Sequence, residues 1–150
     1  MASNSGLRCF NSQSNTAMQT TFPRLLLDHA ARRPNAPAMR EKEYGIWQAH
    51  SWAALARMVE HMAAGLHLAG LQRGEHMAVI SANRPRLYAA VLAAQSLGAI
   101  PVALYQDAVG AECVFPINNA HIRFALVEEQ EQVDKMLEIR SSCPDLAHLM

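Results

Sequence analysis

The sequence has few glycines, few charged side chains and no long apolar run, and each shortage excludes a class of function. Its seven glycines are scattered, with no two of them within three residues of each other. They therefore build neither a Gly-x-Gly-x-x-Gly dinucleotide fingerprint nor a phosphate loop ending in Gly-Lys-Ser or Gly-Lys-Thr. A Gly-x-Ser-x-Gly nucleophile elbow is also absent, which excludes that class of hydrolase. Because no run of about 18 apolar residues exists, the sequence predicts no transmembrane helix.

The charge is balanced as well as sparse. Thirteen Lys and Arg residues face 13 Asp and Glu residues, giving a formal net charge of zero, which argues against a basic nucleic-acid face or an electrostatic membrane anchor. Charged residues make up 17% of the chain and hydrophobic residues 51%. Soluble domains average about 25% charged residues, so part of the apolar surface is expected to meet a partner. A length of 150 residues suits one domain with a real core.

Cysteine and histidine usage predicts neither a disulfide framework nor a metal site. Cys9, Cys113 and Cys143 are odd in number, lie far apart and form no Cys-x-x-Cys pair. Reduced thiols in a cytoplasmic protein are the simplest interpretation. The seven histidines are scattered, and the nearest approach to a metal-binding pair, His61 with His67, misses the i, i+4 spacing.

Residues 1–21 differ in composition from the rest of the chain. They are rich in Ser, Asn, Gln and Thr, contain no acidic residue and carry a single charge on Arg8. They have no apolar segment for a secretory signal, and one Arg is too few for a transit peptide. This composition predicts a disordered polar tail. Met18 leaves open that translation starts there rather than at Met1.

From residue 22 the chain alternates between helical and strand periods. Apolar residues at steps of three and four predict a core-facing stripe on the helix after Ser51, with His61 on the opposite face. Gly70 is expected to end that helix, and Pro116 is expected to kink or shorten a later one. The predicted helices span 22–33, 52–69, 85–97, 111–119 and 128–140, and the predicted strands span 38–40, 46–50, 76–81, 100–104, 122–127 and 146–150.

This alternation predicts an α/β fold in which a parallel sheet has helices on both faces. The last expected strand, 146–150, is apolar and lacks a following helix to cover it. A parallel strand without its helix exposes apolar surface, so we expect a truncated domain that needs further protein after residue 150.

No group of side chains in the sequence forms a convincing catalytic, cofactor-binding or metal-binding site. Asn83 with Arg84 at a helix start could hold an anion, although a cap followed by a solvated Arg explains the pair better. Asp107 and Glu112 are best explained as turn and helix-start residues rather than paired catalytic carboxylates. The two tryptophans, Trp47 and Trp52, fall on apolar positions and are expected to be core anchors.

Several stretches in combination resemble a known family. Gly45-Ile46-Trp47-Gln48 followed by Ser51-Trp52 and the segment from Leu68 to Glu75 are two of them, the latter with Glu75 where Asp is usual. The others are Asn83-x-Pro85, Gly98-Ala99-x-Pro101, Leu104 to Asp107 and Glu131 to Lys135. Together they resemble the start of bacterial long-chain acyl-CoA synthetases, which belong to the AMP-forming, adenylate-forming superfamily.

The resemblance covers residues 20–150 and implies the first subdomain of the large N-terminal domain of such enzymes. Full-length members use ATP, Mg²⁺ and CoA to make an acyl-adenylate and then an acyl-CoA. Their phosphate loop, ribose-binding acid, hinge and catalytic Lys would lie downstream of this segment. The resemblance therefore assigns no catalytic, cofactor-binding or metal residue here, and this chain alone is expected to be inactive.

The resulting prediction is the N-terminal fragment of a long-chain fatty acid–CoA ligase. Its partner would be the remainder of the synthetase fold, with a fatty acid substrate implied only by the resemblance and no nucleic acid. Two alternatives stay open: a stand-alone α/β binding module without catalysis, and a fragment of another branch of the superfamily that activates aryl or amino acids.

Overall fold

The computed structural model describes residues 20–150. The predicted polar tail, 1–21, lies outside the described residues except for its last two positions. No helix within 20–150 is both long and apolar enough to cross a bilayer. The elements, in chain order, are α1 (Phe22–Arg32), β1 (Pro37–Glu43), β2 (Ile46–Ser51), α2 (Trp52–Leu68), β3 (His76–Ile80), α3 (Pro85–Ser96), β4 (Ile100–Ala103), α4 (Gly110–Asn119), β5 (Phe124–Val127), α5 (Gln130–Ile139), a 3₁₀ turn (Arg140–Ser142) and β6 (His148–Leu149).

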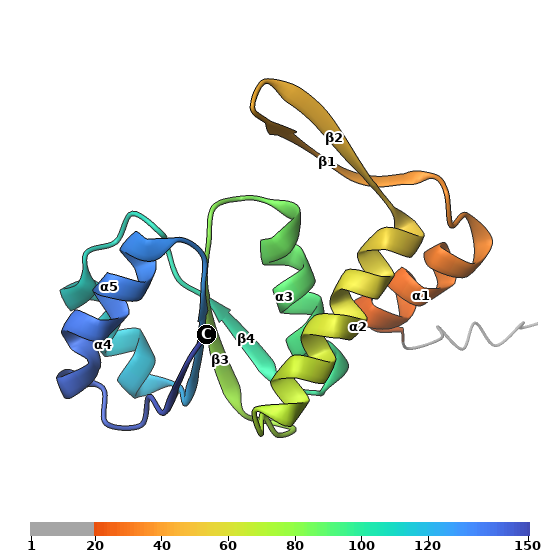
Figure 1. Cartoon of the computed structure of the whole chain (residues 1–150). Helices are drawn as coiled ribbons and strands as arrows, with labels where there is room; N and C mark the ends of the chain where they lie inside the picture. The colour runs from red at the N-terminus through yellow and green to blue at the C-terminus, as the bar shows by residue number, and fades with distance from the viewer. Residues whose placement is uncertain (1–19) are drawn as a thin grey trace, which may run out of the picture.

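The centre of the molecule is a four-stranded sheet in the order β4-β3-β5-β6, and all its strand pairs are parallel. Helices α2 and α3 cover one face and α4 and α5 cover the other (Figure 1). Alternate residues of β3 serve the two cores: Met77 and Val79 pack toward α2 and α3, while Ala78 and Ile80 pack toward α4 and α5. The predicted α/β architecture is confirmed.

Helix α2 carries the predicted core stripe. Ser51 caps its start, because the Ser51 Oγ accepts a hydrogen bond from the Ala54 N–H at 3.2 Å. Leu55, Val59 and Leu66 are buried, and their spacing places them on one face of the helix. The helix ends at Leu68, and Gly70 follows with a φ of +95°, a left-handed conformation that costs glycine little.

Helix α3 lies close to the sheet because its inward face is built of alanines. Ala89, Ala90, Ala93 and Ala94 are each at most 2% exposed. Small side chains let the helix backbone approach its neighbours, and α3 packs against both α2 and β3. The same arrangement turns Tyr88, on another face of α3, toward the surface, where it is 44% exposed.

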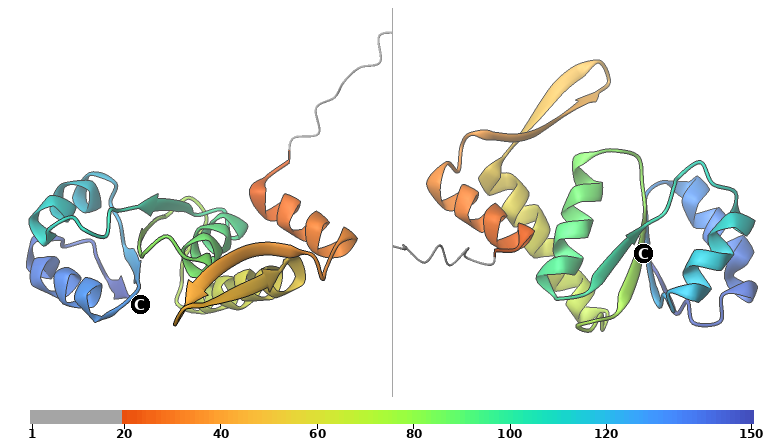
Figure 2. Two further views of the ribbon diagram at one scale, coloured as in Figure 1. Left: turned by 90° about the horizontal axis from the view of Figure 1, so that it is seen from above. Right: turned by 180° about the vertical axis from the view of Figure 1, so that it is seen from behind.

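Strands β1 and β2 form an antiparallel hairpin that projects from the start of α2 (Figures 1 and 2). The prediction that Trp47 anchors the core is wrong, because this side chain on the hairpin is 67% exposed. Trp52 does pack against the core, at the point where the hairpin joins α2. The strands also run longer than predicted, since cross-strand pairing extends toward the turn at Tyr44 and Gly45.

Pro116 does not shorten α4: the helix reaches Asn119, its predicted end, although Pro116 has no N–H to donate to the preceding turn. Other boundaries do differ from the predicted ones. Helix α5 starts at Gln130 rather than Glu128, because Glu128 still belongs to the end of the sheet, where its N–H donates to the Ile80 carbonyl. Strand β6 contains only two residues, His148 and Leu149.

Candidate functional site at the carboxyl edge of the sheet

The carboxyl ends of β3 and β5 lie side by side at one edge of the sheet. Ile80 and Val127, the last residues of the two strands, are paired in register. Ser81 and Glu128 follow them, and the Ser81 hydroxyl donates a hydrogen bond to the Glu128 carboxylate. In open parallel sheets, ligands bind outside this edge of the strands. The edge is therefore the candidate functional site.

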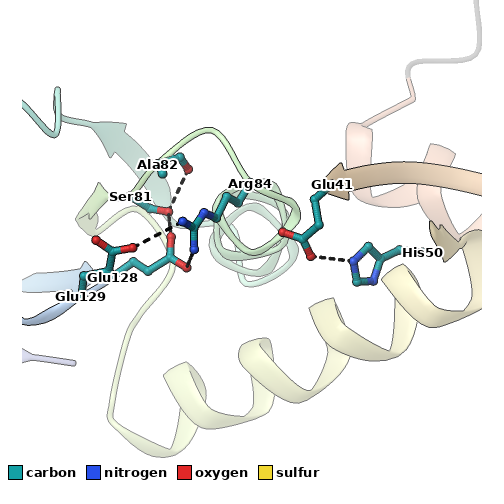
Figure 3. A network of polar contacts seen from close by, with 7 residues as sticks. All are labelled: Glu41, His50, Ser81, Ala82, Arg84, Glu128 and Glu129. Carbon is teal, nitrogen blue, oxygen red and sulfur yellow. Dashed lines mark hydrogen bonds and ion pairs between the residues drawn. The ribbon is translucent and has the colours of Figure 1, made fainter. Parts of the chain in front are cut away.

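Arg84 contacts two carboxylates at this edge (Figure 3). The Arg84 Nη1 lies 3.7 Å from the Glu128 carboxylate, and the Arg84 Nη2 lies 3.5 Å from the Glu129 carboxylate. Two negative charges thus face one positive charge, so the local field opposes a second anion. The anion site considered at Asn83 and Arg84 has the cation that it would need, but that cation is already paired.

Asn83 does not cap α3 as predicted. Arg84 occupies the N-cap position, and no side chain there accepts a hydrogen bond from the first turn. The Asn83 Oδ1 instead accepts a hydrogen bond from the Tyr88 hydroxyl at 2.7 Å. Pro85 at the first helical position explains why a cap is less needed, because it has no N–H to satisfy.

Glu129 adopts a backbone conformation that is rare outside glycine, with φ +75° and ψ 154°. Such conformations cost on the order of 1–3 kcal/mol and occur most often at functional sites. Here the conformation turns the chain sharply from the end of β5 into α5 and brings two consecutive carboxylates to Arg84.

A cavity of about 430 Å³ lies next to this cluster, between Ser81, Asn83 and the loop 104–107. Tyr105 on that loop is exposed, and a hydrogen bond with Asp107 raises the pKa of its hydroxyl above the ordinary value. Glu112 is a helix-start residue as predicted, since its carboxylate accepts a hydrogen bond from the Val109 N–H at 3.2 Å. Across residues 20–150, no group of three acidic, His or Cys side chains is placed to hold a metal ion.

The sequence interpretation missed Glu128 and Glu129 as partners of Arg84. Both were assigned to the start of the following helix, where acidic residues are common. The signal that could have found Glu128 was available, since Ser81 ends one strand and Glu128 follows another, and both strands were expected to be parallel. The approach of Glu129 depends on its positive φ, which a non-glycine residue does not predict.

A doubly wound α/β fold with its polar site at the carboxyl edge of a parallel sheet defines the class of protein. Within that class, the family of AMP-binding enzymes matches residues 26–149. Because this match spans most of the chain, the protein belongs to the AMP-binding enzyme family.

The curated relatives include a short protein without an assigned activity in its name and much longer proteins named as ligases. The chain is 28% identical over 135 residues to "Uncharacterized protein Rv1549" of Mycobacterium tuberculosis, a match covering 90% of this chain and 74% of that protein. It is 25% identical over 119 residues to long-chain-fatty-acid–CoA ligase ACSBG2 of Mus musculus, covering 79% of this chain and 18% of the ligase. It is also 40% identical over 77 residues to the fatty acid–[acyl-carrier-protein] ligase MmaC of Mycobacterium marinum, covering 51% of this chain and 14% of that ligase.

Solved structures confirm the fold. The N-terminal domain of FACL13 from Mycobacterium tuberculosis superposes with a TM-score of 0.77 at 16% identity, covering 85% of this chain and 32% of that chain. Acetoacetyl-CoA synthetase from Streptomyces lividans superposes with a TM-score of 0.76 at 22% identity, covering 85% of this chain and 21% of that chain. The chain thus spans about a third or less of these adenylate-forming enzymes.

Proposed function

We propose that the chain is the first subdomain of the large domain of a long-chain fatty acid–CoA ligase. The observation that carries this proposal is the family match over residues 26–149, together with relatives named as fatty acid ligases. In this role the chain supplies a packed sheet whose carboxyl edge faces the remainder of the synthetase. The free, buried thiols of Cys113 and Cys143 support a reducing, cytoplasmic location.

The described residues do not fit the ATP or Mg²⁺ of full-length ligases. Arg84, the cation at the sheet edge, already faces the carboxylates of Glu128 and Glu129. Stabilising charge at a reacting phosphate needs several preorganised donors or a metal ion. The described residues offer neither a cluster of metal ligands nor a glycine-rich loop. We therefore propose that the chain alone does not activate fatty acids.

Two measurements test this proposal on the purified chain. Fatty-acid-dependent exchange of pyrophosphate into ATP should stay at background, and calorimetry should detect no ATP binding below millimolar concentrations. Arg84→Gln should leave both results unchanged, and so should the control Arg86→Gln, which removes a neighbouring cation. Exchange activity that Arg84→Gln abolishes and Arg86→Gln preserves would overturn the proposal.

A second candidate, a stand-alone module without catalysis, is favoured by one observation. The relative Rv1549 is short enough for a 135-residue match to cover 74% of it. The reading frame after the Met150 codon separates the two candidates. A continuing frame with a Thr-, Ser- and Gly-rich loop supports the ligase, and a stop codon followed by unrelated sequence supports the module.

A further inference from the structure

An open apolar groove runs between α1, α2 and α3 beside Met39 of β1, with a volume of about 490 Å³. It shares no lining residue with the cavity at the sheet edge. Leu26 and Leu55 form part of its buried wall, while Phe22, Leu25 and Tyr88 are 69%, 39% and 44% exposed. Sites for small molecules have volumes of about 300–1,000 Å³ and mostly apolar walls with a few polar groups. The groove has this size and character.

A cation, Arg33, lies beside one end of the groove, where it contacts two of the lining residues. These two, His29 and Trp52, have their ring centroids 4.4 Å apart. The guanidinium carbon of Arg33 lies 5.1 Å from the centre of the Trp52 ring, and one Arg33 nitrogen lies 3.4 Å from His29 Nε2. Stacking on Trp52 holds the guanidinium in place by a cation–π interaction.

No negative charge at this end competes for that cation. The described residues that line the groove include no Asp or Glu. The nearby Asp28 pairs with Arg32 instead, at 2.8 Å. Arg33 forms no ion pair with any carboxylate of residues 20–150, so its charge remains available to a ligand.

From this geometry we infer that the groove binds a medium-chain carboxylic acid, with the carboxylate against Arg33 and His29 and the apolar tail along α1. Charge complementarity selects the head group, because a carboxylate accepts charge-assisted hydrogen bonds from a guanidinium. Phe22 and His29, which line the groove, are seven positions apart on α1, a distance of about 10 Å at the helical rise. That span accommodates an acyl chain of medium length.

Trp52 provides a direct reporter of occupancy. The chain contains two tryptophans, and the other, Trp47, is exposed on the projecting hairpin. In a Trp47→Phe background, decanoate should change the Trp52 emission saturably, and 1-decanol, which lacks the carboxylate, should bind more weakly. Arg33→Gln should weaken decanoate binding about tenfold, as expected for a lost charge-assisted contact, and should leave 1-decanol binding unchanged.

Arg32→Gln is the matched control, since Arg32 is the adjacent cation and is paired with Asp28. It should leave the decanoate affinity unchanged. Leu25→Glu should weaken both ligands by placing a negative charge in the apolar wall, with folding checked by circular dichroism. Equal effects of Arg32→Gln and Arg33→Gln, or no saturable decanoate signal, would overturn the inference.

One further outcome would assign the groove to a different occupant. If sedimentation shows self-association that Leu25→Glu abolishes, and decanoate does not bind, a second copy of the chain covers the groove and the inference is wrong. These results are separate from the proposed function, which depends on the exchange assay and the downstream reading frame.

Discussion

Gly110, the first residue of α4, packs directly against Ile139 at the end of α5. A Cβ built on Gly110 would lie 2.9 Å from the Ile139 Cγ2 and 3.5 Å from the Lys135 Cγ. Real Cβ atoms do not approach this closely, so the two helices meet at a point where only glycine fits. Gly110 is also buried, and Ile139 belongs to the core beneath the two helices.

Gly110→Ala should therefore destabilise the chain. The added methyl must displace the Ile139 side chain or separate α4 from α5, and overpacking of this kind costs about 1–3 kcal/mol. The measurement is the free energy of unfolding in urea, followed by circular dichroism. An Ala variant as stable as the wild type would show that α5 can shift without cost.

Gly65→Ala is the matched control for that substitution. Gly65 lies inside α2, and a Cβ built on it would meet nothing within 4 Å. Alanine in a helix interior is favoured over glycine by about 0.5–1 kcal/mol. Gly65→Ala should thus raise the midpoint of urea unfolding while Gly110→Ala lowers it. The opposite order of the two midpoints would contradict both assignments.

The buried face of α2 can be tested in the same way. Leu66 is 3% exposed, and Leu66→Ala should cost roughly 2–5 kcal/mol because it removes buried methyl groups and leaves a cavity. His61 is exposed on the same helix, and His61→Ala should change stability by less than about 0.5 kcal/mol. Equal urea midpoints for the two variants would mean that the apolar face of α2 does not pack into the core.

Local sequence patterns predicted helix α2 well, because its N-cap residue, the spacing of its apolar residues and the glycine after its end all indicate the same helix. Ser51 caps α2, Leu55, Val59 and Leu66 keep the helical spacing, and Gly70 follows its end. The parallel sheet was predictable for a similar reason, since alternating strands and helices leave few other arrangements. The pattern within one helix, and the order of elements along the chain, were enough for these features.

Features that depend on contacts between distant segments could not be read in this way. Trp47 has the apolar character of a core anchor, yet it is exposed because its hairpin projects from the body. Arg84 is paired because β5 ends beside β3, and Glu129 reaches it only through a positive φ. The candidate site therefore appeared only once the register of the two strands was known.

The buried thiols predict a loss of stability at alkaline pH. Burial raises the pKa of both Cys113 and Cys143 above the ordinary value, so the folded chain keeps these thiols protonated to a higher pH than the unfolded chain does. The unfolded chain loses the same protons near pH 8.5. Stability should be unaffected by these groups below that pH and should fall as the pH rises through and above it.

Alkylation tests the burial of the two thiols, on which this prediction depends. In a Cys9→Ser variant at pH 8, iodoacetamide should modify neither Cys113 nor Cys143 until urea unfolds the chain, because both side chains are at most 2% exposed. Replacing both with Ser as well should abolish all labelling. Rapid modification of either thiol in the native chain would show that this core opens locally.

The conformation of Glu129 leads to the last prediction. Two variants, Glu129→Ala and Glu129→Gly, both remove the carboxylate that faces Arg84, so the lost ion pair cancels in their comparison. Only glycine adopts φ +75° with ψ 154° without strain. Glu129→Gly should accordingly be more stable than Glu129→Ala by roughly 1–3 kcal/mol in urea unfolding. Equal stabilities would mean that the turn from β5 into α5 relaxes to a negative φ when the contact with Arg84 is lost.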